Sequence, residues 1–418
     1  MLHTGTALVL WKGDPETDNH TEKLKKIYAI AVCFVFPIFG LYSLIGSFGW
    51  AHLYLCIVFI ILYIDCLRKN CLEYDRRFLE IVIYTIFQTL FISMFLERVN
   101  GVDLWLKVLQ WLLFILTIAM FNHTYFDYKI MQKILRITVV LSCAYLLVQQ
   151  AIAWVFHIYL PPGIPFLPYV REELKSAYYS LYIYGGIYRP RSFFSEPALF
   201  CQFALSALTI ELFNREEDKN WKYILLLILS IGISKSGTGY FVLAFILLAY
   251  GLIGISKKRK LQKKYLPLVI LAIPIDLALV MIIPDVQRVW QRFFGGETFL
   301  SNLVGQERFK SIFISQVFKE SNVLKMVFGR GFSLDDYTGF YLGGLLRHFY
   351  CFGLVGVFIL IYTMVRIYIM GNTMQRMLIL VFLFMSTGAN PLHNSDLMIP
   401  LAFASFPMGG GTFVVEDT

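Results

Sequence analysis

Long apolar runs separated by short polar stretches dominate this chain, and they restrict the folds open to it. A membrane-spanning helix needs about 20 apolar residues, whereas a strand of a membrane barrel needs about 10. Most runs here have the length of a helix, which bonds its own backbone groups where lipid offers no partner. The predicted spans are 27–47, 50–67, 78–96, 104–121, 134–159, 193–213, 221–233, 240–255, 265–283, 341–362, 377–387 and 397–408.

These spans predict an all-α polytopic membrane protein with about twelve transmembrane helices, in a single integral membrane domain over residues 1–418. Composition agrees, because only 16% of the residues are charged, against about a quarter in soluble domains. The last two runs are short and flank the polar stretch 388–396. A re-entrant tail, with about ten or eleven spans in total, is therefore the alternative.

The lysines and arginines form short clusters, such as Lys257–Lys264, that alternate with outer turns nearly bare of positive charge. Positive residues gather on the cytoplasmic side of membrane proteins, so this alternation predicts a cytoplasmic N-terminus. The net charge of +9 is split among these short loops. Nucleic-acid binding is therefore not expected.

Two long segments, 160–192 and 284–340, fall on the outer side as outer loops and carry many basic residues. Long loops escape the positive-inside rule, so ordinary solvated charge is one interpretation. Phosphate binding is the other, because arginine forms bidentate contacts with phosphate. The first loop is also rich in tyrosine, which fits either a membrane-surface belt or a platform for sugar rings.

Disulfides, metal sites and cofactors are not expected. Six of the seven cysteines lie in apolar runs and Cys71 lies in a basic loop, so no disulfide framework is implied. Neither a CxxC nor an HExxH spacing occurs, and no Asp-x-Asp pair suggests a metal.

The stretch Tyr188–Ala198, YRPRSFFSEPA, carries Arg189, Arg191 and Glu196 at the start of an apolar run. Pro197 suits the first turn of a helix. Glu196 then lies at the N-cap or just before it, where a carboxylate meets N–H groups and the positive end of the helix dipole. One interpretation is a capped helix with two headgroup arginines. The other is a site in which the arginines bind an anion and Glu196 handles a proton.

Lys235 stands in a second polar stretch, Ser234–Gly239, between two apolar runs. Small residues leave backbone N–H groups exposed around the lysine, which suits an anionic group such as a phosphate. A tight turn with a snorkelling lysine is the simpler interpretation of these six residues alone.

Basic residues also surround the start of the tenth span. Arg292 and Arg330 lie in the second outer loop, Arg330 within the sequence FGRGF, and Arg347 and His348 lie next to each other a short way on. Arg347 suits an anion and His348 a proton transfer near neutral pH. Headgroup anchoring by Arg347, with His348 packed between helices, is the alternative.

Together these segments resemble the Wzy-type O-antigen and capsule repeat-unit polymerases, within the wider polymerase and ligase superfamily. The residues that carry the resemblance are Arg189–Pro197 at a span start, Ser234–Gly237, the FGRGF sequence, and the pair Gly353 and Gly356. Their order and the two outer loops are similar to that family over roughly the second half of the chain. Two features depart from it: the arginine-to-glycine spacing from Arg171 to Gly186 is one residue short, and the ligases' His-Asn pair is absent.

The resemblance implies a GT-C-like glycosyltransferase of the bacterial inner (cytoplasmic) membrane, independent of metal. It would polymerise oligosaccharide repeat units linked to undecaprenyl diphosphate, both donor and acceptor, at the periplasmic face, with membrane lipids and a chain-length regulator as further partners. Glu196, His348 and Arg191 would be catalytic. Arg189, Lys235, Arg347, Arg330 and Arg292 would bind the pyrophosphate. An O-antigen ligase or a polysaccharide flippase remains the alternative.

Overall fold

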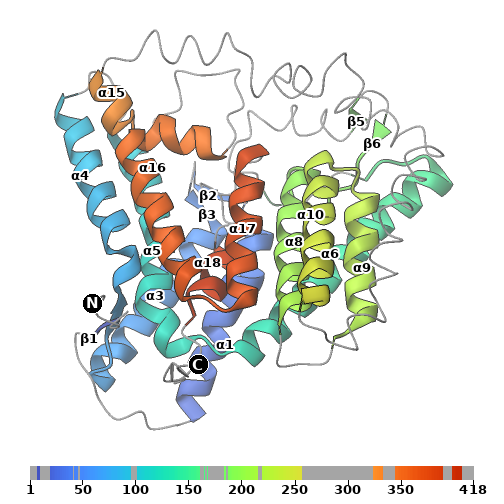
Figure 1. Cartoon of the computed structure of the whole chain (residues 1–418), viewed down its shortest axis with the longest axis horizontal. Coiled ribbons are helices and arrows are strands. Elements are labelled where there is room, and N and C mark those ends of the chain that lie inside the picture. Colours follow the sequence, from blue (N-terminus) through green and yellow to red (C-terminus); the bar gives the residue numbers. More distant parts are fainter. Residues whose placement is uncertain are drawn as a thin grey trace.

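The structure is a computed structural model that describes residues 7–9, 19–40, 42–45, 48–95, 101–160, 164, 167, 183–184, 187–214, 219–256, 323–332, 344–388 and 398–406. This part of the chain is mostly helical, and the long helices run roughly side by side (Figure 1). The α-helices of the described residues, long and short, are α1 (Asn19–Ile30), α2 (Phe36–Phe39), α3 (Trp50–Lys69), α4 (Leu79–Phe95), α5 (Gly101–Tyr125), α6 (Tyr128–Phe156), α8 (Pro197–Phe213), α9 (Trp221–Ile233), α10 (Gly237–Ser256), α15 (Val323–Phe328), α16 (Gly344–Met370), α17 (Thr373–Gly388) and α18 (Met398–Ser405).

Five helical segments of the described part are long and apolar enough to cross a membrane. They are Trp50–Lys69, Arg76–Met94, Leu104–Tyr125, Tyr128–Phe156 and Gly344–Met370. Four shorter apolar helices accompany them: Pro197–Phe213, Trp221–Ile233, Gly237–Ile253 and Thr373–Ser386. These helices fit a polytopic helical membrane protein. The expected total of twelve spans stays a prediction, and the predicted span 265–283 lies outside the described residues.

Most predicted spans correspond to one helix, and the first corresponds to three consecutive helical pieces. There α1 continues through a π-helical turn, η1 (Ala31–Val35), into α2. The helix α8 begins four residues later than the predicted span 193–213. Glu196 is its N-cap and Pro197 its first residue, so the preceding residues are left to form a turn.

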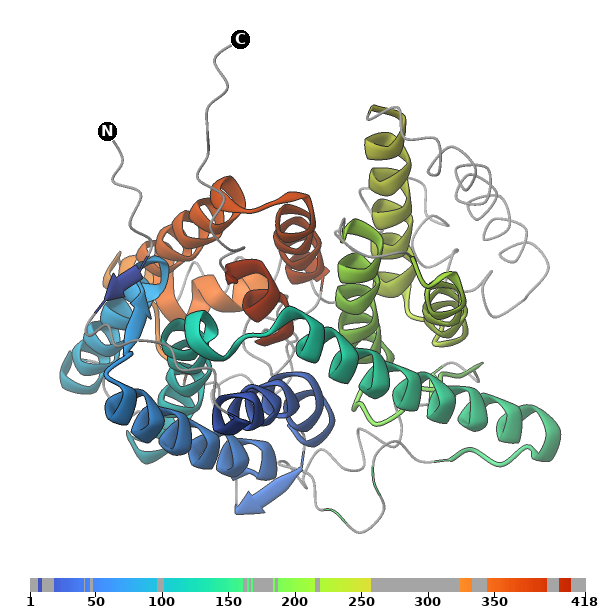
Figure 2. The same ribbon diagram turned by 90° about the horizontal axis from the view of Figure 1, so that it is seen from below.

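The helix α8 lies at the centre of the second half of the bundle (Figure 1). Every residue of α8 except Leu199 is buried, in contact with α6, α9, α10 and α17. An apolar surface all round is what a fully enclosed helix requires. The long helix α6 runs past α1 at one end and α9 at the other, and so links the two halves of the bundle (Figure 2).

The helix α16 is broken at Gly353, whose φ of 66° and ψ of −171° are not helical. The part before the break lies across the bundle, and the part after it runs along α4 (Figure 1). The expected span 341–362 is therefore not one straight helix. At the break, Gly353 meets Gly329 so closely that a Cβ on Gly353 would lie 2.4 Å from the Gly329 nitrogen.

The break frees backbone carbonyls, and α4 supplies donors for them. The Gln88 side chain donates to the carbonyls of Phe328 (2.9 Å) and Cys351 (2.7 Å), and the Tyr84 hydroxyl donates to that of Phe352 (2.5 Å). Backbone N–H groups of the FGRGF segment complete the junction, from Arg330 to Tyr350 and from Gly331 to Cys351. Irregular backbone inside a membrane protein is stable only when its polar groups are bonded in this way.

Short antiparallel strand pairs join the helices. The strand β1 (Ala7–Val9) pairs with β4 (Glu73–Asp75), β2 (Ser43–Ile45) with β3 (Phe48–Gly49), and β5 (Ile183–Tyr184) with β6 (Ile187–Tyr188). A 3-10 turn, η2 (Arg76–Phe78), leads from β4 into α4. We call the end of the bundle that carries β6 and the start of α8 the site end, and the end that carries β4 the opposite end.

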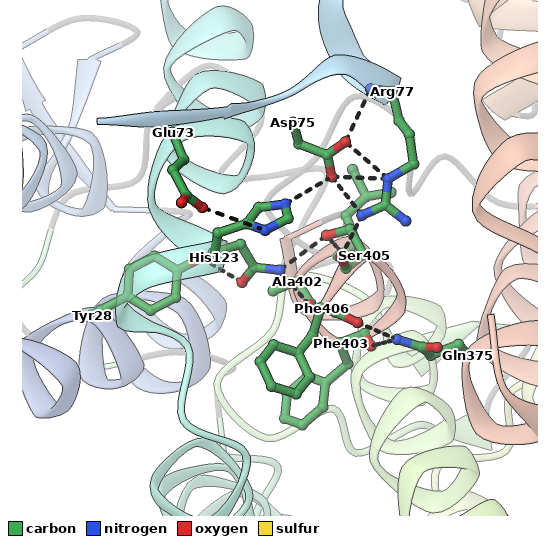
Figure 3. Close-up of polar contacts among 12 residues, drawn as sticks. Tyr28, Glu73, Asp75, Arg77, His123, Gln375, Ala402, Phe403, Ser405 and Phe406 are labelled. Carbon is green, nitrogen blue, oxygen red and sulfur yellow. Dashed lines mark hydrogen bonds and ion pairs between the residues drawn. The ribbon is translucent and has the colours of Figure 1, made fainter. Parts of the chain in front are cut away.

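A polar cluster at the opposite end holds the short helix α18, all eight residues of which are buried (Figure 3). Arg77 donates to the carbonyl of Ser405, Asn122 to that of Ala402 (2.8 Å) and Gln375 to that of Phe406 (2.6 Å). The last carbonyls of a helix lack intrahelical partners. Three separate elements therefore cap α18, which is too short to span a membrane by itself.

Candidate functional site

A strained turn precedes α8 at the site end. Ser192 is fully buried and has a φ of 57°, a left-handed conformation that costs a residue other than glycine about 1–2 kcal/mol. The Gln149 side-chain oxygen accepts from the backbone N–H groups of Arg191 (3.2 Å) and Ser192 (2.8 Å). The Ser192 hydroxyl donates to the carbonyl of Ser142 at 2.7 Å. Two residues of α6 thus hold this turn in place.

Arg191 is buried inside the turn that it begins. Only 1% of its surface is exposed, and its guanidinium donates to the carbonyl of Ser195. Arg189 is half-buried, and its charge reaches the Cys201 thiol in the second turn of α8. A neutral carbonyl fixes the direction of a guanidinium without bringing a negative charge to it.

Lys235 joins the second predicted segment to the first. It has a φ of 53°, and its ammonium donates to the carbonyl of Tyr188 at 3.1 Å. The neighbouring Ser234 hydroxyl lies 3.1 Å from the Cys201 sulfur. Gly239 packs against the same sulfur, where a Cβ would come within 2.5 Å. The turn between α9 and α10 therefore lies against the start of α8.

Backbone strain marks the turn before α8 independently of its charge. Among the described residues, four other than glycine have a positive φ: Asn70, His157, Ser192 and Lys235. Asn70 and His157 are helix C-caps and Lys235 directly follows the C-cap of α9, and a left-handed residue is common at the end of a helix. Ser192 does not follow a helix, and it lies in a segment predicted to bind an anion. Strained residues that the surrounding structure holds in place tend to cluster at functional sites.

Glu196 differs from every other acidic residue whose side chain the structure describes. Its backbone carbonyl accepts from Leu199 and Phe200 as an N-cap should, but its side chain makes no cap hydrogen bond. The remaining acidic side chains each lie within 4 Å of a basic group; they are Glu22, Asp65, Glu73, Asp75, Glu80, Asp127 and Glu211. The half-buried Glu196 carboxylate has no such partner among the described residues.

Arg330, Arg347 and His348 form a second group around the break in α16. Arg330 lies over the Tyr350 ring, 5.0 Å from its centroid, and donates to its hydroxyl at 3.2 Å. Arg347 hydrogen-bonds the Cys351 thiol, which Lys107 of α5 also approaches closely enough to interact electrostatically. Lys107 was not among the predicted site residues.

His348 is buried and packs inside the break itself. Its Nε2 lies 3.3 Å from the carbonyl of Gly356, and its ring lies 4.7 Å from that of Phe352. Because a carbonyl only accepts, Nε2 carries the proton, and Nδ1 is the nitrogen that accepts one. These contacts of His348 are with other residues of α16 itself, and its predicted proton-transfer role stays a prediction.

The structure describes seven of the eight predicted site residues. Arg292 and the greater part of both outer loops lie outside the described residues. No group of three or more His, Cys, Asp or Glu side chains within the described ranges could hold a metal ion. The sequence analysis did not predict Gln149 or Ser142 as site residues. A glutamine inside an apolar run usually faces the interior of a helical bundle, and this signal could have identified Gln149.

The described fold fits a polytopic helical membrane protein, with two groups of predicted basic site residues, one near the start of α8 and one around the break in α16. Comparison with known proteins adds no family: no family model matches the chain, and no curated protein or solved structure matches it.

Proposed function

We propose that this protein is a membrane glycosyltransferase that polymerises oligosaccharide repeat units linked to undecaprenyl diphosphate into O-antigen or capsular polysaccharide. The motif resemblance supplies the substrate class. The observation that carries the proposal is the Glu196 carboxylate, which has no basic partner among the described residues. It follows the turn that contains Arg191, and Lys235 bonds the carbonyl of Tyr188 just before that turn. This combination offers a proton acceptor and several fixed cations within one small region.

The chemistry of the reaction needs both features. A lipid pyrophosphate leaves as an anion, and cations fixed before the reaction stabilise the charge that develops. The acceptor hydroxyl must lose its proton as it attacks, and a positioned carboxylate can take it. Arg189, Arg191 and Lys235 fill the first role and Glu196 the second. Arg330 and Arg347 would meet a second phosphate group. The reaction requires no cofactor.

A transporter of lipid-linked glycans is the second candidate, and the broken helix α16 favours it. Discontinuous helices are common at the substrate sites of transporters. A transporter would move repeat units across the membrane without joining them. The product therefore distinguishes the two functions.

Glu196→Gln tests the proposal in purified protein supplied with lipid-linked repeat units. Glutamine keeps the shape but cannot accept the proton, so the polymerisation rate should fall about 10²–10⁴-fold. Glu80→Gln is the control, since Glu80 pairs with Arg366 at the opposite end of the bundle. A wild-type protein that moves repeat units across vesicles but forms no polymer would establish the transporter instead.

A further inference from the structure

We infer that Gln149 of α6 is a positioning residue. Its side-chain amide holds the turn before α8, which contains Arg191 and Ser192 and which we propose to bind an anion. This inference rests on the proposed function, because it names the residue that prepares the same site for a prenyl diphosphate. Gln149 is 1% exposed and lies some 40 residues before the turn in sequence. It touches the turn through three hydrogen bonds, and all three go to backbone atoms.

The side-chain amide of Gln149 bonds the turn through both its oxygen and its nitrogen. Its oxygen accepts from two successive N–H groups, those of Arg191 and Ser192. Its nitrogen donates to the carbonyl of Ser192 at 3.4 Å. An apolar side chain would leave these buried groups without partners, and buried polar groups are costly when they are not bonded.

The contacts also offset the strain at Ser192. Gln149 and Ser142 are seven residues apart, so two helical turns bring them to the same face of α6. Together they bond the N–H, the carbonyl and the hydroxyl of Ser192. A hydrogen bond from the Phe194 N–H to the Arg191 carbonyl closes the turn around Ser192. Loss of Gln149 therefore releases the backbone of Arg191 and Ser192.

The geometry further limits how the site can bind its ligand. Two successive N–H groups that converge on one oxygen form an arrangement that elsewhere binds anions. Here the Gln149 oxygen already occupies it. The phosphate is therefore left to the side chains of Arg189, Arg191 and Lys235, and the role of Gln149 is to fix where those side chains begin.

The neighbouring Gln150 provides a matched control. It is also buried, at 3% exposed, and none of the described hydrogen bonds joins it to the turn. The experiment compares the full-length wild type with Gln149→Met, Gln149→Glu and Gln150→Met. It measures the affinity of each purified protein for farnesyl diphosphate, together with hydrogen exchange of the peptide that contains residues 191 and 192.

Gln149→Met leaves the N–H groups of residues 191 and 192 without this acceptor, so hydrogen exchange at these two residues should become faster. Binding should weaken about tenfold or more, and a factor of ten corresponds to about 1.4 kcal/mol. Gln149→Glu keeps the accepting oxygen and should restore slow exchange, but its negative charge repels a diphosphate, so its affinity should stay below that of the wild type. Gln150→Met should behave as the wild type in both measurements. Equal affinity and exchange in Gln149→Met and Gln150→Met would overturn the inference. A wild type that does not bind farnesyl diphosphate would count against the proposed function, while the exchange measurement still decides whether Gln149 holds the turn.

Discussion

Gly353→Ala should be among the most destabilising single substitutions in this protein. The φ and ψ of Gly353 fall in a region that essentially only glycine adopts, which costs other residues about 1–3 kcal/mol. A Cβ there would also lie 2.3 Å from the carbonyl oxygen of Val327. That atom belongs to backbone and cannot swing aside, so the junction between α15 and α16 must open.

Opening the junction disturbs further hydrogen bonds. The Gly331 N–H donates to Cys351 at 2.8 Å and Gln88 donates to Phe328 at 2.9 Å, and each such bond contributes about 1 kcal/mol net. We therefore expect Gly353→Ala to lower stability by about 3–5 kcal/mol. The effect is measured by heating each purified variant in detergent and following the fraction that stays folded by gel filtration.

Gly232→Ala is the matched control. Gly232 lies within the last turn of α9, and a Cβ there would meet nothing within 4 Å. Alanine in a helix is favoured over glycine by about 0.5–1 kcal/mol, so this variant should be neutral or slightly more stable. If Gly353→Ala proved as stable as Gly232→Ala, the contact between the two glycine-containing segments would not exist as described.

Two predictions concern ion pairs at the opposite end of the bundle. Glu211→Gln removes a carboxylate that is 3% exposed and that Arg136 contacts at 2.9 and 3.0 Å, and it should cost about 3 kcal/mol in thermal unfolding. Glu80→Gln removes a carboxylate that is 40% exposed and should cost about 0–1 kcal/mol. Similar losses would refute this ranking. Burial acts to raise the pKa of Asp75, but the close approach of His123 at 3.7 Å, the hydrogen bonds from Arg77 and the Arg77 charge outweigh it, so this pKa lies below its usual value. A lowered pKa gives stability that is present above the usual value of about 4 and is lost as the pH falls through the folded pKa. Asp75→Asn should therefore unfold earlier than wild type at pH 7. The difference between the two melting temperatures should begin to shrink as the pH falls below about 4 and should vanish below the folded pKa of Asp75.

The sequence was sufficient for those helices whose ends are set by local chemistry. The helix α9 begins and ends at the expected residues, because Asn220 caps its first turn and a glycine-containing stretch follows. The start of α3 at Trp50 was also expected. The break in α16 could not be predicted, because it depends on the approach of Gly329 from a segment about 24 residues earlier in the chain.

The candidate site shows a similar division. Arg189, Arg191, Lys235 and Glu196 stood out in the sequence because charge is rare beside apolar runs. Their mutual arrangement did not, because the bond from Lys235 to Tyr188 spans 47 residues and those from Gln149 to the turn span 42 or 43. Long-range contacts of this kind leave no trace in local composition. Gln149 could have been identified only by the rule that polar side chains inside membrane spans are usually bonded or functional.

Neutral groups help to orient the basic side chains at the site end. Arg191 and Lys235 donate to backbone carbonyls and Arg330 donates to a tyrosine hydroxyl. At the opposite end some basic side chains meet carboxylates, as Arg77 meets Asp75 and Arg136 meets Glu211, whereas Lys219 donates to the carbonyls of Glu211 and Asn214. A neutral group orients a cation without bringing a negative charge to it. Cations that are oriented before the reaction are what a site for an anionic leaving group requires.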